Sequence, residues 1–212
     1  MGRKTKFKKG PLIQLLEVGI EFWIRSQCNS IETVKLELNG SFLRLISGNI
    51  SELRLIANEV NFQGFLLKHV DLTSDSLQIK VNLSNKYQKV YIKQSFNIDG
   101  IVYLDERCLN TILFSKSWSW VGDSLAKQLL DIEKLEKLEI KGDKIIFSGL
   151  EDRQGTISTG SYGIKASKGK LCIEDEDSLK HSLLPMDDSI QIKKAILKNN
   201  ELEISISSTV NP

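Results

Sequence analysis

The chain has 212 residues, of which 41% are hydrophobic and 26% are charged, and its formal net charge at neutral pH is +2. This length is sufficient for one large domain or two small ones with a sizeable core, and the balanced charge excludes a general affinity for nucleic acid. Cys28, Cys108 and Cys172 are too far apart for a disulfide framework or for paired zinc ligands, and they indicate a reducing compartment.

The first residues differ from the rest of the chain in charge. Residues 1–9, MGRKTKFKK, carry five basic side chains and no acidic one. Such a block is typical of a solvated tail, and it is also suited to attraction by an anionic membrane surface. We therefore expect residues 1–10 to form a basic flexible tail and residues 11–212 a single domain. The side chains expected to contact lipid head groups are Arg3, Lys4, Lys6, Lys8 and Lys9.

The segment 11–27, PLIQLLEVGIEFWIRSQ, is predicted to form a helix, because proline is tolerated in a first turn. Its polar residues form one narrow stripe, in which Glu21 and Arg25 are spaced for an i,i+4 ion pair. A helix that is apolar over most of its circumference must be enclosed, either by a curved sheet or by a membrane interface. The glutamates in this short apolar run argue against a secretory signal or a membrane span, so we expect a cytoplasmic protein that is peripheral to a membrane or free of one.

From residue 33 to residue 104 the apolar residues recur at every second position, which predicts long antiparallel strands. Strands longer than the usual five or six residues favour a large curved sheet. Within 50–72 the alternating apolar residues change from odd to even positions at Asn58-Glu59. This change of parity predicts a bulge or corner that bends one long strand. Gly64 is expected to relieve crowding at this bend. The strand segments are 33–38, 42–46, 50–72, 72–83 and 88–104, with turn signals at 39–40, 48–49 and 85–86.

Two helices are predicted in the middle of the chain, one over 105–113 capped by Asp105 and one over 117–132. Beyond residue 135 the strand pattern returns, with hairpin turns at 142–143, 168–169 and 199–200. This order of elements predicts an α+β fold dominated by the sheet. The candidate for a hinge is the loop-like stretch 149–161.

The sequence contains none of the familiar catalytic or cofactor motifs. His69 and His181 have no catalytic partner nearby in the sequence, and the glycine-rich stretch 155–163 lacks the lysine of a phosphate loop. The acidic run 174–177 lacks the alternating spacing of a calcium loop. We therefore expect no catalytic residue, no metal site and no cofactor, and a protein that is not an enzyme.

Aromatic residues lie beside predicted turns and helix ends. Such side chains either fill a core beneath helices or line a groove for an apolar ligand, and Trp-x-Trp is also typical of membrane interfaces. Both interpretations stay open for these pairs. The pairs are Phe22 and Trp23, Phe62 and Phe65, and Trp118 and Trp120.

Four segments resemble the LmeA-like phospholipid-binding family, a former domain-of-unknown-function family that is well represented in cyanobacteria. They are WIRSQ (23–27), LISG (45–48), VNFQGFLLKHVDL (60–72) and LDERCLNTIL (104–113), and the similarity covers most of residues 20–130. The resemblance implies a fold like that of the tubular lipid-binding proteins, with a long, strongly curved antiparallel sheet wrapped around the N-terminal helix. It also implies non-catalytic binding of a phospholipid or another amphipathic lipid in an apolar groove.

Our main hypothesis is therefore a lipid-binding module that contacts an anionic membrane surface. The alternative is a structural or protein-interaction module whose interior is filled by its own side chains. A third hypothesis, a hydrolase acting on lipids, would need a nucleophile beside His69 or His181. The residues expected to contact the acyl chain are Leu16, Ile20, Trp23, Phe62, Phe65, Leu113, Trp118 and Trp120.

Overall fold

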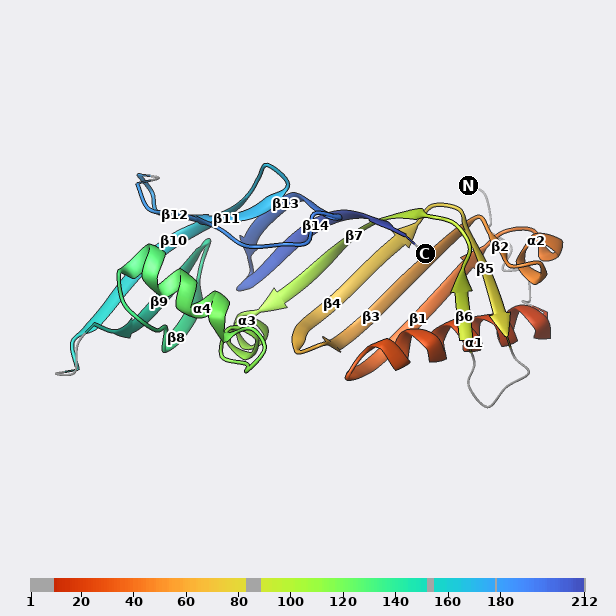
Figure 1. Ribbon diagram of the computed structural model, residues 1–212, viewed down its shortest axis with the longest axis horizontal. Helices are drawn as coiled ribbons and strands as arrows, with labels where there is room; N and C mark the ends of the chain where they lie inside the picture. Colours follow the sequence, from red (N-terminus) through yellow and green to blue (C-terminus); the bar gives the residue numbers. More distant parts are fainter. Residues whose placement is uncertain (1–9, 83–88, 152–154, 178, 212) are drawn as a thin grey trace.

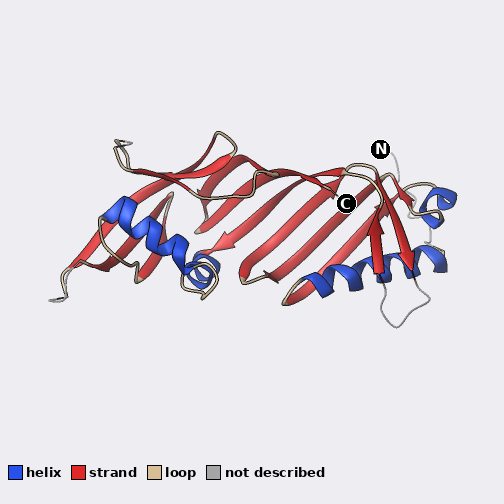
Figure 2. Cartoon of the chain, in the orientation of Figure 1, coloured by secondary structure: helices blue, strands red, loops and turns tan. Residues whose placement is uncertain are grey.

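The computed structural model describes residues 10–82, 89–151, 155–177 and 179–211. Antiparallel strands predominate and the helices lie beside them (Figures 1 and 2). The predicted α+β class is confirmed, and so is the N-terminal helix.

The largest sheet has six strands in the order β1-β3-β4-β7-β14-β13, and every neighbouring pair is antiparallel. The C-terminal hairpin β13–β14 lies beside β7, although β8 to β12 intervene in the sequence (Figure 1). The strands are β1 (Ser30–Asn39), β3 (Glu52–Phe62), β4 (Phe65–Ser74), β7 (Phe96–Asp105), β13 (Ile190–Lys198) and β14 (Glu201–Val210).

Two smaller sheets lie at the ends of the molecule. The first, in the order β12-β11-β10-β9-β8, has five strands, and the second, in the order β2-β5-β6, has three. The five strands are β8 (Lys137–Lys141), β9 (Lys144–Leu150), β10 (Ile157–Ser167), β11 (Lys170–Glu174) and β12 (His181–Leu183). The three strands are β2 (Asn49–Ile50), β5 (Leu77–Asn82) and β6 (Lys89–Ile92).

The division into three sheets differs from the single large sheet predicted from the sequence. The chain leaves the six-stranded sheet after β4, at Asp75. There the Asp75 carboxylate accepts hydrogen bonds from the backbone and side-chain N–H groups of Asn97, both at 2.9 Å. The Asp75 N–H still donates to the Asn97 carbonyl at 3.0 Å, so this pair closes the ladder between β4 and β7, and the chain continues into β5, which pairs with β6.

The helices follow the sequence pattern closely. α1 (Pro11–Gln27) has the predicted bounds and lies along one end of the six-stranded sheet, next to β1 and β6 (Figure 1). α3 (Glu106–Leu113) begins after Asp105, whose Oδ1 accepts a hydrogen bond from the Cys108 N–H at 2.9 Å. The second central helix divides into α4 (Ser119–Leu125) and the π-helical turn η1 (Ala126–Leu130).

The strand predicted over residues 42–46 is wrong, because this segment forms the short helix α2 (Phe42–Ile46). Its single turn directs Leu45 into the core. Gly48 follows the helix with a φ of 79°, which is the left-handed conformation that commonly ends a helix. A Cβ atom at this glycine would lie 2.0 Å from the Ile79 carbonyl oxygen, so the backbone of β5 passes too close for any side chain.

The three C-terminal hairpins are confirmed. Gly142 has a φ of 67°, and the pairs Lys168-Gly169 and Asn199-Asn200 each have two positive φ angles, as type I′ turns require. The stretch 149–161, the candidate hinge, contains the end of β9, the start of β10 and the connection between these two paired strands.

The prediction of one long strand over 50–72 is wrong, because Gln63 and Gly64, with φ angles of 52° and 85°, form a hairpin turn between β3 and β4. The change of parity at Asn58-Glu59 lies within β3, and it coincides with an unusual backbone conformation rather than an inserted residue. Glu59 has a φ of 48°, yet the pairing of β3 with β1 and with β4 continues in the same register on both sides of it. Ala57 and Val60, three residues apart, are consequently buried in the same core. The Arg107 guanidinium on α3 donates a hydrogen bond to Glu59 Oε2 at 2.6 Å and holds this kink against the helix.

Three buried clusters form the interior, and α1 is not enclosed by them. The central cluster includes Val70, Leu104 and Leu202, and the cluster here called C-terminal includes Leu129, Leu138 and Phe147. The two share partly buried neighbours, Leu109 and Trp118 among them. The N-terminal cluster lies beneath α1 and α2. Leu15, Val18 and Phe22 of α1 are 44–56% exposed, so the expectation that a sheet surrounds this helix is wrong.

Candidate functional site

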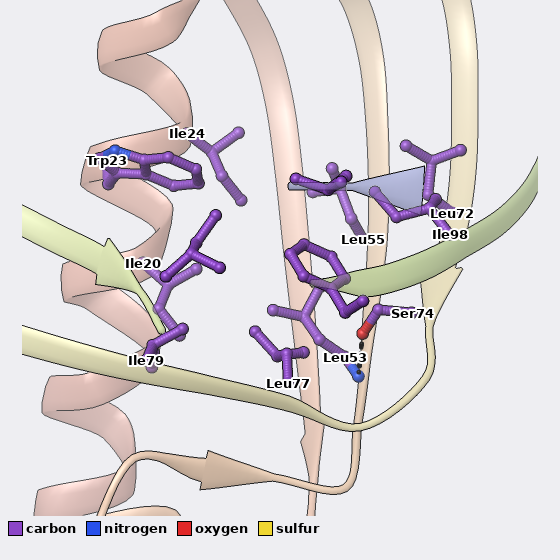
Figure 3. A pocket seen from close by; sticks show the side chains of 13 residues that line it. Ile20, Trp23, Ile24, Leu53, Leu55, Leu72, Ser74, Leu77, Ile79 and Ile98 are labelled. Carbon is purple, nitrogen blue, oxygen red and sulfur yellow. Dashed lines mark hydrogen bonds between the residues drawn. The ribbon is translucent and has the colours of Figure 1, made fainter. Parts of the chain in front are cut away.

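An apolar cavity of about 200 Å³ lies between the inner face of α1, the six-stranded sheet and the paired strands β5 and β6 (Figure 3). The cavity is partly open to solvent. Twelve of its thirteen lining side chains are apolar, which is typical of a site for the apolar part of a ligand. The lining residues are Ile20, Trp23, Ile24, Leu53, Leu55, Leu72, Ser74, Leu77, Ile79, Ile92, Phe96, Ile98 and Val210.

One wall of the cavity is formed by Ile20, Trp23 and Ile24 of α1 (Figure 3). Their spacing of three and four residues places them on one side of the helix. Arg25 fixes the rotation of the last turn, because its Nη1 donates to the Ile31 carbonyl of β1 at 2.9 Å and its Nε to Glu21 at 3.0 Å. The predicted Glu21–Arg25 pair is therefore confirmed, and it lies on the flank of the helix rather than in the cavity.

The floor of the cavity is one face of the six-stranded sheet. Leu55 on β3 is paired with Leu72 on β4, which is in turn paired with Gly100 on β7. A Cβ atom at Gly100 would lie 2.4 Å from a methyl carbon of Leu72, so the glycine allows Leu72 to lie across β7. Ile98 on β7 extends the same apolar surface.

Ser74 is the one polar residue in the lining, and its hydroxyl group is already bonded. It accepts a hydrogen bond from the Leu53 N–H at 3.2 Å and donates one to the Asp75 carbonyl at 2.9 Å. Apart from the indole N–H of Trp23, the lining side chains therefore offer no further hydrogen-bonding group, and none of them is titratable. Such a site selects ligands by shape and apolar area, and a polar or charged group would lose its hydration there without compensation.

The first group of residues predicted to contact lipid lies on α1. Ile20 and Trp23 line the cavity. Leu16 is one turn before Ile20 and packs against the N-terminal cluster, but it does not line the cavity. The structure thus brings two of these three predicted residues, Ile20 and Trp23, together with apolar residues of six strands.

The second group gathers at a different place, where the β3–β4 hairpin meets α3 and α4. The rings of Phe65 and Trp118 pack edge to face with centroids 5.5 Å apart, and Trp118 Nε1 donates to the Gln63 carbonyl at 3.3 Å. Leu113 is buried in the C-terminal cluster. Phe62 and Trp120 are exposed. None of these five predicted residues lines the cavity.

Most of the cavity residues were not predicted from the sequence. They come from strands β3, β4, β5, β6, β7 and β14, and the signal that marks them is the alternation of apolar residues along each strand. Alternation identifies a buried face, but it does not show which buried residues leave space between them. The predicted head-group residues Arg3, Lys4, Lys6, Lys8 and Lys9 lie outside the described residues.

The reactive side chains lie away from the cavity. His69 Nδ1 lies 2.6 Å from Asn58 Oδ1. His181 is exposed on β12, an edge strand of the five-stranded sheet. Burial raises the pKa of the Cys108 thiol to about 11, which keeps it protonated at neutral pH. Within the described ranges, no three His, Cys, Asp or Glu side chains are grouped as a metal site would require.

Two further results bear on the class of protein. Among the helices that the structure describes, none is long and apolar enough to cross a membrane. No family model, no curated protein and no solved structure matches the chain.

Proposed function

We propose that this protein binds one acyl chain of a phospholipid or of another amphipathic lipid, without catalysis, in the cavity between α1 and the six-stranded sheet. The observation that carries this proposal is the composition of the cavity wall, with twelve apolar side chains and one hydroxyl group that is already hydrogen-bonded. Each CH₂ group transferred from water into such a wall contributes roughly 0.8 kcal/mol to binding.

The volume of the cavity limits the ligand. An apolar cavity of about 150 Å³ in another protein holds a benzene molecule. A cavity of about 200 Å³ therefore suits a segment of a single alkyl chain rather than both chains of a phospholipid. Because the wall has no charged group, the head group stays outside, at the open side of the cavity. The LmeA-like resemblance implies the same class of ligand, although in this protein the helix lies beside the sheet and is not surrounded by it.

The test is a comparison of two tryptophan variants on β7. Ile98→Trp fills the cavity, whereas Ile101→Trp places the same ring on the opposite face of the same strand, where the side chain is also partly buried. We expect binding of a fluorescent fatty acid, and co-purification of lipid seen by native mass spectrometry, to be lost in the first variant and retained in the second.

The lipid-binding proposal is wrong if no lipid accompanies the wild-type protein after mild extraction and no lipid raises its melting temperature. One observation would then favour a structural or protein-interaction module. The cavity is smaller than the roughly 300–1,000 Å³ of most ligand sites, and three packed clusters fill much of the remaining interior.

A further inference from the structure

Large exposed apolar side chains are concentrated at the N-terminal end of the molecule. Of the fourteen such side chains within the described ranges, six belong to α1 and α2, and they are 44–74% exposed. Single exposed apolar residues are ordinary on protein surfaces, but a contiguous group usually marks a binding surface. The six residues, here called the α1–α2 face, are Leu15, Val18, Phe22, Phe42, Leu43 and Ile46.

On α1 the exposed residues lie opposite the cavity. Leu15, Val18 and Phe22 are separated by three and four residues, so they form one ridge along the helix. At about 100° per residue, this ridge is on the side of the helix away from Ile20 and Ile24, which face the cavity. The helix is therefore apolar on two opposite sides, and only the inner side is covered by the protein.

α2 extends this ridge at the beginning of α1. A Cβ atom at Gly10, the residue before α1, would lie 3.7 Å from the ring of Phe42, so the two helices are in contact there. Leu45 is the inward residue of α2 and is 3% exposed, whereas Leu43 is 74% exposed. The two helices lie at the same end of the molecule (Figure 1), and both carry exposed apolar side chains.

Charges of both signs surround this face, since α1 itself carries Glu17 and Glu21, and Glu21 is paired with Arg25. Arg44 on α2 is exposed, and its guanidinium forms no ion pair with a described residue. The chain that leads directly into α1 contributes five basic residues and no acidic residue in positions 1–9. An apolar ridge together with a basic segment is the combination that holds proteins stably on anionic membranes, where neither signal alone is sufficient.

We propose that the α1–α2 face is the surface by which this protein docks on an anionic lipid bilayer, with the apolar ridge in the interfacial layer and Arg44 among the lipid head groups. The inference extends the proposed function, since α1 is then both the wall of the cavity and the contact with the membrane. Its test does not depend on whether the cavity holds a lipid.

The experiment measures partition of the full chain onto vesicles of phosphatidylcholine containing about 30% phosphatidylglycerol. We expect wild-type protein to bind these vesicles, and the double variant Val18→Gln/Phe22→Gln to bind about tenfold or more weakly. Phe42→Gln/Leu43→Gln should have a similar effect. Replacing the anionic lipid with phosphatidylcholine, or raising the salt concentration from about 0.05 M to about 0.5 M, should weaken binding of the wild-type protein.

The matched control is Leu150→Gln/Ile157→Gln. These two residues are paired across β9 and β10 in the five-stranded sheet, and they are 44% and 66% exposed. This control should bind vesicles as the wild type does. The proposal is overturned if wild-type protein does not bind the anionic vesicles, or if Val18→Gln/Phe22→Gln binds them equally well. It is also overturned if light scattering shows a dimer that this double variant dissociates, because the face would then be an interface between two copies.

Discussion

At the end of the molecule formed by α4, η1 and the five-stranded sheet, helices and strands share one buried cluster. The Phe147 and Tyr162 rings lie 5.7 Å apart in the C-terminal cluster, and the Tyr162 hydroxyl donates to the Leu129 carbonyl at 2.7 Å. At the other end, α1 faces the six-stranded sheet across a cavity of about 200 Å³. No residue of the C-terminal cluster lines that cavity.

The difference reflects how the helices are attached to the sheets. The Asn110 side chain of α3 donates to the Leu138 carbonyl and accepts from the Leu138 N–H, at 2.8 and 3.1 Å, and Glu106 Oε2 accepts from the Ile140 N–H at 2.9 Å. α3 is therefore bonded directly to the edge of β8. At the cavity, α1 is bonded to β1 through Arg25 at its last turn. A helix that is fixed to a strand edge packs closely on it, whereas one attached near its end can stand away from the sheet.

The largest expected difference between the two ends concerns large-to-small substitutions. Phe147 is 1% exposed, so Phe147→Ala should lower the free energy of unfolding by about 3–5 kcal/mol. Leu55→Ala should cost less, about 1–2 kcal/mol, because Leu55 is only partly buried and already borders empty space. Urea denaturation of both variants measures the contrast, and equal losses would contradict it.

The attachment of α3 is tested by Asn110→Ala. This change removes both hydrogen bonds to Leu138 and leaves buried backbone groups without partners, so we expect a loss of about 2–3 kcal/mol. Arg25→Ala at the other end removes a bond from a more exposed side chain, and it should cost about 1 kcal/mol or less. If Arg25→Ala were the more damaging of the two in urea denaturation, the attachment argument would fail.

Added volume should have opposite consequences at the two ends. Leu138→Phe inserts a larger side chain into a filled core and should lower the unfolding free energy by about 1–3 kcal/mol. Leu55→Phe has the cavity available and should leave the unfolding free energy unchanged or raise it slightly. Thermal melts of the two variants distinguish these outcomes, and a strongly destabilised Leu55→Phe would show that the cavity is not accessible to that side chain.

The helix N-termini give a smaller contrast. Asp105→Ala removes the side-chain cap of α3 and should cost about 1 kcal/mol, whereas Asp105→Asn keeps an acceptor and should cost less. α1 begins after Gly10 without a side-chain cap, and a Cβ atom there meets the Phe42 ring at an ordinary 3.7 Å. Gly10→Asp should therefore add a few tenths of a kcal/mol, measured by urea denaturation. A destabilised Gly10→Asp would mean that the start of α1 cannot accept a cap.

The smallest expected effect is on the outer face of the central sheet, which belongs to neither end. The hydrogen bonds and charge of Arg54 hold the pKa of Asp71 below its ordinary range, with N–O distances of 2.9 and 2.6 Å. Because the folded-state pKa is the lower one, the pair contributes stability above the pKa of an unfolded aspartate and loses it as the pH falls below that value. Asp71→Asn should show a smaller acid-induced loss of stability than the wild type. At neutral pH its effect on the free energy of unfolding should be below that of Asp105→Ala, because the side chains of Arg54 and Asp71 are 44% and 30% exposed. Identical pH profiles for the two proteins would exclude this contribution.

Local features of the fold were predictable because neighbouring residues decide them. The Asp105 cap and the paired turn residues of the C-terminal hairpins identified elements that the structure confirms. Residues 42–46 misled the prediction, because Leu43 and Leu45 on either side of Arg44 give the alternation of a strand, whereas in the helical turn only Leu45 faces inward. Gly48, which ends α2 in the left-handed conformation, was the signal that would have distinguished them.

The candidate site was only partly predictable. Ile20 and Trp23 were expected to face a ligand because the helix periodicity places them on one side, and they line the cavity. Phe65 and Trp118 were expected in the same place, yet they pack against each other at the β3–β4 hairpin. Aromatic character indicates burial, but only the packing of distant segments determines which aromatic ring borders a cavity.

The sequence by itself determined the α+β class, the α1 helix and the apolar face of each strand, because hydrophobic periodicity and turn chemistry act over a few residues. Only the tertiary structure decided that the strands divide into three sheets, that space remains beneath α1 and that the outer ridge of α1 is uncovered. These features depend on the distance between elements that are far apart in the chain. That distance is set by the balance of packing and hydrogen bonding across all of them.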